Sequence, residues 1–466
     1  MFGTFIPFLL LYFYPLLVTS ELLMVSEYFR HGAREPVYEY YDYDSYPSRG
    51  ELTPVGMRQH YNLGQILRHE YIDKMHFLSP EYDPSEIYVS STNVNRTIIS
   101  ALAQLYGLYP LGTGPKLANL SDEELYTPPF EINDNGFSYP LNDNKEALPG
   151  FFQPIPIHNT GNEDMILRPY DHKICVLNEK WQQAQQQTVF FKDLLQELNV
   201  TIQNVKKLMN LTEDIDLKQV EGIYDVFQND KWAGKPLPAG FQGDLKKNMS
   251  FIFDFWYYYV NFGTERQRLT LSGGLFKEVR DFFSNKLQGR EEKKWLMYSA
   301  HDTTLIMIFS ALNLSNYQCV LAKWRGTLKS DDLCIPLPDY ASSIIFELHK
   351  EERMTTVKVR YNGKYLREYK YDEFERIMNR SVKALEEDEE FLRECGDVEI
   401  EAVEKKVKNS HAGVWFLFGV IIGIVLAMVF CMVRSHLIKK KLRLLDVNMT
   451  KESDKRGGSI QLTDAL

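Results

Sequence analysis

The sequence predicts an α/β fold: a mixed, mainly parallel sheet flanked by helices, with a smaller inserted helical cap domain and one C-terminal transmembrane helix. Three short apolar segments read as strands, and each runs directly into a helical pattern: Glu21–Phe29, Ile87–Val89 and Trp295–Tyr298. A long, helix-rich stretch separates the second from the third. Strands that feed helices are typical of an α/β sheet. The transmembrane helix is predicted from an uncharged run near the end of the chain.

The first strand ends at Arg30-His31-Gly32. Downstream, Thr53 has the character of a helix N-cap, and Pro54 that of a first helical residue. A second helix follows Ser90-Ser91-Thr92, and a third follows the strand at Trp295–Tyr298 and runs through Leu312. Two later segments read as a hairpin at a sheet edge, Ser343–Leu348 and Thr355–Tyr361.

The middle of the chain has a different composition. Its first part is rich in Pro, Asn and Gly, and its second part carries long polar helical faces with aromatic clusters. We therefore predict an α/β core built from residues 21–112 and 266–398, and a loop-rich and helical cap subdomain at residues 113–265.

Both ends of the chain resemble membrane-targeting segments. Residues 1–20 have the apolar run and the small residues of a signal peptide. Residues 412–433 form an uncharged run that is long enough for a helix to span a hydrocarbon core of about 30 Å. A charged stalk at 399–411 precedes this helix, and a tail at 434–466 follows it. We expect a single-pass type I membrane protein with a lumenal or extracellular body. Lysosome, vacuole and cell surface stay open.

The charge is distributed unevenly. The formal net charge is -10, with about -14 on residues 21–433 and about +4 on the tail. An acidic body disfavours a nucleic-acid partner, which would normally meet a basic face. The basic tail suits the cytoplasmic side of a membrane.

Unusual polar residues follow all three strands. Arg30, His31 and Arg34 lie at the first strand-to-helix junction, Arg96 lies near the second, and His301-Asp302 lies at the third. Because ligands bind beyond the carboxyl ends of strands in open α/β sheets, these residues can converge on one site. Arginines and histidines gathered together would repel one another without an anion between them. Since arginine matches phosphate oxygens bidentately, a phosphoryl group is the natural occupant.

The residue types then suggest roles. A histidine among arginines stays neutral and can attack phosphorus. The arginines and the second histidine neutralise charge in the transition state. A carboxyl at the site can protonate the leaving oxygen; for Asp302 this requires a retained proton, which predicts an acidic optimum. We expect no metal and no cofactor, because no cluster of suitable ligands is evident.

The cysteines and the glycosylation sequons agree with export of the body of the protein from the cytosol. Cys175, Cys319, Cys334 and Cys395 allow two disulfides, with three possible connectivities. Six sequons are candidate glycosylation sites: Asn119, Asn199, Asn210, Asn248, Asn313 and Asn379. We expect a seventh, at Asn95, to stay bare because it adjoins Arg96.

The motifs carry a family resemblance. Residues 30–36, Arg-His-Gly-Ala-Arg-Glu-Pro, resemble the RHGxRxP signature of the histidine acid phosphatases, and residues 298–304 resemble their HD motif. Residues 50–56, 91–96 and 153–158 also match. The likeness spans roughly residues 21–398 and is similar to the membrane-anchored lysosomal and prostatic type.

The resemblance implies a function and specific roles. It implies an acid phosphatase that hydrolyses phosphate monoesters through a phosphohistidine on His31, with Asp302 as general acid. It assigns phosphate binding to Arg30, Arg34, Arg96 and His301. It also implies the disulfides Cys175–Cys395 and Cys319–Cys334.

Other interpretations stay open. One is a phytase-like enzyme acting on inositol polyphosphates, although the acidic body is a poor long-range attractor for such substrates. Another is a catalytically silent membrane receptor with the same fold, which the complete residue set disfavours. A phosphoglycerate-mutase-like transferase is disfavoured by export and by the HD motif. The tyrosine-rich loop Tyr38–Tyr46 reads as a solvated loop or an acidic rim that selects substrates. A homodimer is one open oligomeric arrangement.

Overall fold

The computed structural model describes residues 20–37, 49–117, 145–159, 162–352 and 354–395. All of them belong to one compact unit, residues 1–395. The predicted signal peptide (except Ser20), tyrosine-rich loop, stalk, transmembrane helix and tail lie outside the described residues. Within these ranges, no helix combines the length and the apolar character needed to cross a membrane.

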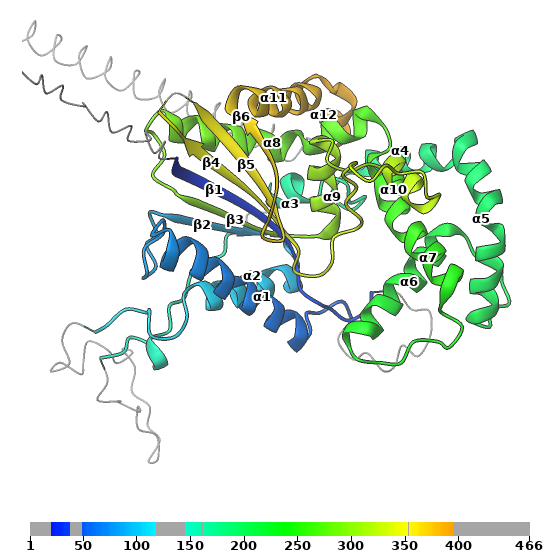
Figure 1. Cartoon of the computed structure of the whole chain (residues 1–466), viewed down its shortest axis with the longest axis horizontal. Coiled ribbons are helices and arrows are strands. Elements are labelled where there is room, and N and C mark those ends of the chain that lie inside the picture. Colours follow the sequence, from blue (N-terminus) through cyan, green and yellow to red (C-terminus); the bar gives the residue numbers. More distant parts are fainter. Residues whose placement is uncertain (1–19, 38–48, 118–144, 160–161, 353, 396–466) are drawn as a thin grey trace, which may run out of the picture. The chain divides into compact units, whose positions relative to one another are not determined.

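Six strands form a single sheet in the order β2-β3-β1-β4-β5-β6 (Figure 1). Their bounds are β1 Glu21–Arg30, β2 Ile87–Ser91, β3 Trp295–Ala300, β4 Ser343–Lys350, β5 Thr355–Tyr361 and β6 Lys364–Lys370. The three strands predicted to lead into the site, β1, β2 and β3, lie next to one another. Their carboxyl ends therefore meet at one edge of the sheet.

The sheet is mixed, as predicted, but "mainly parallel" is wrong. The β1–β3 and β2–β3 pairs are parallel, whereas the β1–β4, β4–β5 and β5–β6 pairs are antiparallel. Both parallel pairs lie among the three strands that are linked through helical crossovers. The C-terminal strands follow each other through short connections, which favour antiparallel pairing.

The predicted hairpin is also not at the edge of the sheet, because β6 extends it. Asn362 and Gly363 connect β5 to β6, and both have positive φ, 49° and 74°. An Asn-Gly pair with this geometry is the strongest short signal for a two-residue hairpin turn. Four of the seven β6 residues are Lys, Arg or Glu, which is typical of an edge strand that avoids further pairing.

Helices cover both faces of the sheet (Figure 1). On one side, α1 packs on α2, and α2 contacts β2 and β3. On the other, α8 and α9 contact β1, and α11 packs on α8. These five helices span α1 Pro54–Leu67, α2 Asn95–Leu108, α8 Glu265–Leu287, α9 Asp302–Ala311 and α11 Tyr371–Glu387.

Further helices fill the predicted cap region. They are α3 Asn162–Leu167, α4 Val176–Gln186, α5 Val189–Leu208, α6 Leu217–Trp232 and α7 Gly243–Trp256, followed by the π-helix η5 Tyr257–Asn261. Outside this region, the π-helix η2 Arg68–Lys74 continues α1, α10 spans Tyr317–Trp324 and α12 spans Glu389–Cys395. The predicted subdomain boundaries stay a prediction.

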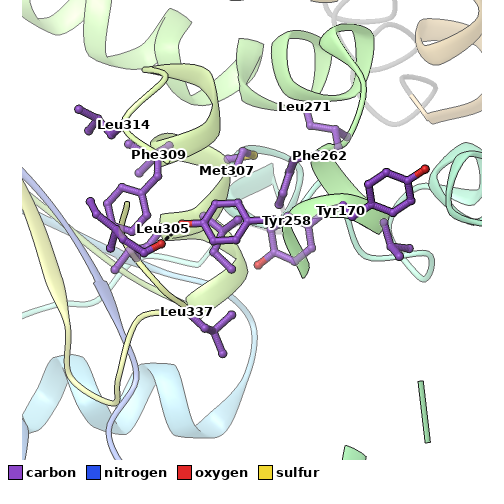
Figure 2. Packing of buried hydrophobic residues seen from close by; sticks show 14 of the residues in the cluster. Tyr170, Tyr258, Phe262, Leu271, Leu305, Met307, Phe309, Leu314 and Leu337 are labelled. Carbon is purple, nitrogen blue, oxygen red and sulfur yellow. Dashed lines mark hydrogen bonds between the residues drawn. The ribbon is translucent and has the colours of Figure 1, made fainter. Parts of the chain in front are cut away.

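The central strands β1 and β3 are buried on both faces. Val25 and Phe29 of β1 pack towards α1 and α2, whereas Met24 and Tyr28 belong to the larger core on the opposite face. That larger core continues into the helical region. Figure 2 shows Leu305, Met307 and Phe309 of α9 packed among Tyr258, Phe262 and their neighbours. The helix that begins at Asp302 is thereby fixed between the sheet and the inserted helices.

Both predicted disulfides are confirmed. Cys175 pairs with Cys395, and Cys319 pairs with Cys334. The first joins residues 220 positions apart and ties α12 to the start of α4.

Candidate active site

The end of β1 passes close to the start of α1. A β-carbon on Gly32 would collide with the backbone of Gly56, so the close approach requires glycine. Thr53 caps α1, as predicted: its Oγ1 accepts from the Gly56 amide at 3.1 Å and donates to the Ala33 carbonyl at 2.8 Å. One hydroxyl therefore fixes both the helix start and the loop after His31.

His31 is buried, and its orientation is set by a backbone contact. Its Nδ1 lies 2.9 Å from the Gly32 carbonyl oxygen, which can only accept, so Nδ1 carries the proton. Nε2 is then the nitrogen with the free lone pair. Burial, followed by the charges of Arg96 and Arg30, holds the pKa of His31 well below its ordinary value. The ring is neutral and nucleophilic at Nε2.

Arg30 is held on three sides. One guanidinium nitrogen donates to the Pro338 carbonyl at 2.5 Å, and the other lies 2.7 Å from Oδ2 of Asp302. The guanidinium carbon lies 4.1 Å from the centre of the Tyr340 ring. This stacking adds a cation–π contact and fixes the plane of the guanidinium.

Arg34 is anchored by a residue of the helical region. Both oxygens of Asp225 on α6 accept from its NH2, at 3.0 and 3.1 Å, and both side chains are buried. Although burial acts in the opposite direction, the Asp225 carboxylate raises the pKa of Arg34 above its ordinary value. The bidentate contact orients Arg34 towards the site.

Arg96 lies in the first turn of α2, close to Gly50. Burial and the neighbouring Arg34 lower its pKa to about 10. Among the described residues, Nε of Arg30, Arg34 and Arg96 is in each case buried and without a hydrogen-bond partner. Three buried donors without acceptors are costly, and one anion could satisfy them together.

The third junction supplies His301 and Asp302. Nε2 of His301 lies 3.0 Å from the Thr92 hydroxyl at the end of β2, so the second and third junctions are joined directly. The His301 ring centre lies 5.6 Å from that of His31. Burial, then Arg96 and Arg168, lower the pKa of His301 well below its ordinary value. Oδ1 of Asp302 accepts from the backbone and hydroxyl of Thr303, at 2.7 and 3.0 Å.

These side chains border a cavity of about 250 Å³. Of the six predicted site residues, its wall includes His31, Arg34, Arg96, His301 and Asp302. Arg30 is not part of this wall: it contacts Asp302 and lines another cavity, of about 170 Å³, together with Asp225 and Tyr340. The sequence-based reasoning missed four contributors: Asp225, Tyr340, Thr92 as the partner of His301, and Arg168. Only Thr92 lay in a quoted motif, so the other three gave no signal.

Arg168 lies directly after α3 and lines the same cavity. Its guanidinium pairs with Asp171 and lies 3.9 Å from Asp164. A fourth arginine is therefore present, but two carboxylates compensate its charge.

The predicted glycosylation sites differ in exposure. Asn199, Asn210, Asn313 and Asn379 are exposed, and Asn119 lies outside the described residues. Asn248 is half-buried: its Nδ2 donates to Thr201 and its Oδ1 accepts from the Trp324 indole, both at 2.8 Å. A glycan on this nitrogen would separate α7 from α5. Asn95 is exposed and donates to Glu51 at 3.1 Å.

Residues 42–362 match the histidine phosphatase superfamily (branch 2). The chain belongs to this family. The match includes Arg96, His301 and Asp302 and begins shortly after His31. In this histidine phosphatase, the RHG segment and the HD pair lie at the ends of the neighbouring strands β1 and β3, as the sequence motifs predict.

Acid phosphatases are among its most similar curated relatives. This histidine phosphatase is 30% identical over 341 residues to human lysosomal acid phosphatase, covering 71% of the chain and 68% of the relative. It is 29% identical over 347 residues to the Xenopus laevis lysosomal enzyme, covering 72% and 68%. It is also 29% identical over 358 residues to bovine prostatic acid phosphatase, covering 74% and 78%.

Solved structures share the fold at lower identity. The phytase from Citrobacter braakii matches with a TM-score of 0.52 and 13% identity, over 78% of this chain and 99% of that chain. The apo phytase from Hafnia alvei matches with a TM-score of 0.52 and 14% identity, over 78% and 98%. At such identities, the likeness concerns the fold of this histidine phosphatase alone.

Proposed function

We propose that this protein is a metal-independent acid phosphatase that hydrolyses phosphate monoesters through a phosphohistidine on His31. The observation that carries the proposal is the group of three arginines whose buried Nε donors have no acceptor among the described residues, next to a neutral histidine. A phosphoryl group supplies the missing acceptors and the electrophile together.

In the first step, Nε2 of His31 attacks phosphorus and the ester oxygen leaves. The new N–P bond forms as the P–O bond breaks, and a proton from Asp302 converts the leaving oxygen to an alcohol. Arg30, Arg34, Arg96 and His301 hold the equatorial oxygens, whose charge they stabilise in the transition state. In the second step, water attacks phosphorus and the N–P bond breaks, which releases phosphate and restores neutral His31, while Asp302 accepts the water proton.

Asp302 begins α9 at the edge of the cavity, where a leaving group would lie. Its Oδ1 is held by Thr303, and its Oδ2 faces Arg30. A phosphate bound to Arg30 would compete for that guanidinium and leave Oδ2 free to carry the proton for the leaving oxygen. An acidic working pH follows from this role.

The alternatives find less support. A substrate with many phosphates would require several uncompensated cations, but Asp164 and Asp171 compensate Arg168, and Asp225 compensates Arg34. A silent receptor would have no need of a neutral, correctly oriented His31.

The activity can be tested with residues 21–408, the predicted body. We expect p-nitrophenyl phosphate hydrolysis between about pH 4 and 6 and at least a thousandfold loss in His31→Ala. A matched control is His69→Ala, which changes a histidine outside the site. An inactive wild type, or a His31→Ala variant that keeps its rate, would refute the proposal.

We also propose that the body lies in the lumen of an organelle or outside the cell. Two disulfides and relatives named lysosomal and prostatic acid phosphatases support such a compartment. The signal peptide and the membrane helix at 412–433 complete the proposed type I topology.

A further inference from the structure

A chain of buried hydrogen bonds runs from the catalytic segment into the sheet. It begins at the Arg30 carbonyl, which faces Nε2 of His60 on α1 at 3.1 Å. Nδ1 of His60 lies 3.0 Å from Oε1 of Gln104 on α2. The Gln104 amide nitrogen lies 3.1 and 3.0 Å from the two oxygens of Glu27 on β1. All three side chains are fully buried, and none belongs to the phosphate site.

The groups in this chain of hydrogen bonds determine how many titratable protons His60 and Glu27 carry together. A backbone carbonyl only accepts, so Nε2 of His60 must carry a proton. In the observed orientation, the Gln104 oxygen also needs a proton from Nδ1, which makes His60 a cation next to the Glu27 carboxylate. If the amide turns over, His60 is neutral and Glu27 is protonated. Both arrangements contain two protons and satisfy every contact.

With one proton fewer, the chain cannot be complete. His60 is then neutral and Glu27 ionised, and Gln104 can donate its amide hydrogens to only one of these two acceptors. In either orientation, its oxygen faces a lone pair. A buried contact of this kind is destabilising, because the two lone pairs repel each other and neither has a donor.

We propose that His60, Gln104 and Glu27 are positioning residues that hold the Arg30–His31 segment for catalysis only while their shared proton is present. The proposal rests on the proposed phosphatase activity and deepens it. It adds a source of acid dependence that acts through the nucleophile segment and is separate from Asp302.

The groups around Glu27 act on its proton in opposite directions. Burial favours the protonated form, whereas Ser343 on β4 donates to Oε1 at 2.9 Å and favours the ionised form. From η2, the Tyr71 hydroxyl donates to Glu347 on β4 at 2.6 Å, and Glu347 also pairs with Arg360 on β5 at 3.0 Å. That arginine is therefore already engaged, and β3 contributes Trp295 and Met297, which do not titrate.

The pKa values agree with this geometry. Burial raises the pKa of Glu27 to about 7, against the lowering effect of its hydrogen bonds with Ser343 and Gln104. Burial lowers the pKa of His60 to about 4. These pKa values favour the arrangement with the Gln104 amide turned over, in which the shared proton resides on Glu27 and is lost as the pH rises through about 7.

The test compares kcat for p-nitrophenyl phosphate in wild type and Glu27→Gln. This substrate needs little leaving-group protonation, so the contribution of Asp302 to the pH profile is small. The glutamine donates permanently to Gln104 and completes the chain without a shared proton. We expect wild-type kcat to fall about tenfold from pH 5.5 to 8 and that of Glu27→Gln to fall less than about threefold.

The matched control is Asp254→Asn on α7. Burial also raises the pKa of Asp254 to about 7, but this carboxyl lies outside the chain and accepts from the Leu337 amide. We expect its kcat profile to follow wild type. Superimposable profiles for wild type and Glu27→Gln would overturn the inference, whereas an inactive wild type would instead overturn the proposed function.

Should Glu27→Gln fail to fold, Ser343→Ala decides the question. It removes a hydrogen bond that lowers the pKa of Glu27. The proton is then retained to higher pH, and the alkaline fall in kcat moves to higher pH. An unchanged profile in this variant would contradict the inference.

Discussion

At the scale of single residues, the site depends on side chains whose orientation is fixed by contacts with neighbouring residues. Gly32 fixes the tautomer of His31, Asp225 holds Arg34 in a bidentate pair, and Tyr340 stacks on Arg30. Such supporting contacts orient the reacting groups before substrate arrives, which is where much of the rate enhancement of an enzyme originates.

Asp302→Asn tests the general-acid role. The variant removes the ionisable proton and weakens the contact with Arg30, which affects every substrate. Only substrates with poor leaving groups also lose protonation of the departing oxygen. We expect kcat/KM for an alkyl phosphate to fall at least about tenfold more than that for p-nitrophenyl phosphate. Equal losses for the two substrates would remove Asp302 from this role.

At the scale of elements, the start of α1 connects stability to the site. Thr53→Ala removes the cap of α1 and the bond to the Ala33 carbonyl. We expect a loss of about 1–2 kcal/mol in the free energy of unfolding, measured by urea denaturation. Thr53→Ser keeps the hydroxyl and should stay close to wild type; a similar loss in both variants would show that the hydroxyl is unimportant.

The elements were predictable where local signals were strong. The apolar strands before Arg30 and His301, the Thr53 cap and the position of Arg96 all followed from residues that are adjacent in sequence. The strand β6 was missed, although Asn362-Gly363 signals a turn, because its charged residues hide the strand pattern. Asp225, Tyr340 and Arg168 reach the site only through tertiary contacts between distant segments. No local pattern could identify them.

At the scale of the whole molecule, buried carboxyls make the free energy of unfolding depend on pH. Burial raises the pKa of Glu27 and Asp254 to about 7 and that of Glu221 to about 8. Each binds its proton more tightly in the folded state, so its stabilisation is complete below about pH 4.5 and is lost as the pH rises towards 8. Hydrogen bonds with their neighbours lower the pKa of Asp171 and Asp388 despite burial, which penalises folding at still lower pH.

The buried histidines His31, His60 and His301 act in the opposite direction, because their lowered pKa values penalise folding as the pH falls below about 6.5. We therefore expect the melting temperature to change little between about pH 4.5 and 6.5 and to fall by several degrees from there to pH 8. Calorimetry of the predicted body at a series of pH values measures this. In Asp254→Asn the fall should be smaller, because one of the three carboxyls no longer titrates. A melting temperature that rises steadily up to pH 8 would contradict these assignments.

The covalent intermediate is the most direct test of the proposed mechanism. A phosphate monoester labelled with ³²P is mixed with the enzyme, the reaction is stopped within milliseconds in alkali, in which phosphohistidine is stable, and the labelled peptide is sequenced. The mechanism predicts label on His31 and none in the His31→Ala variant. Label on another residue, or turnover by the wild type without any labelled His31, would contradict it.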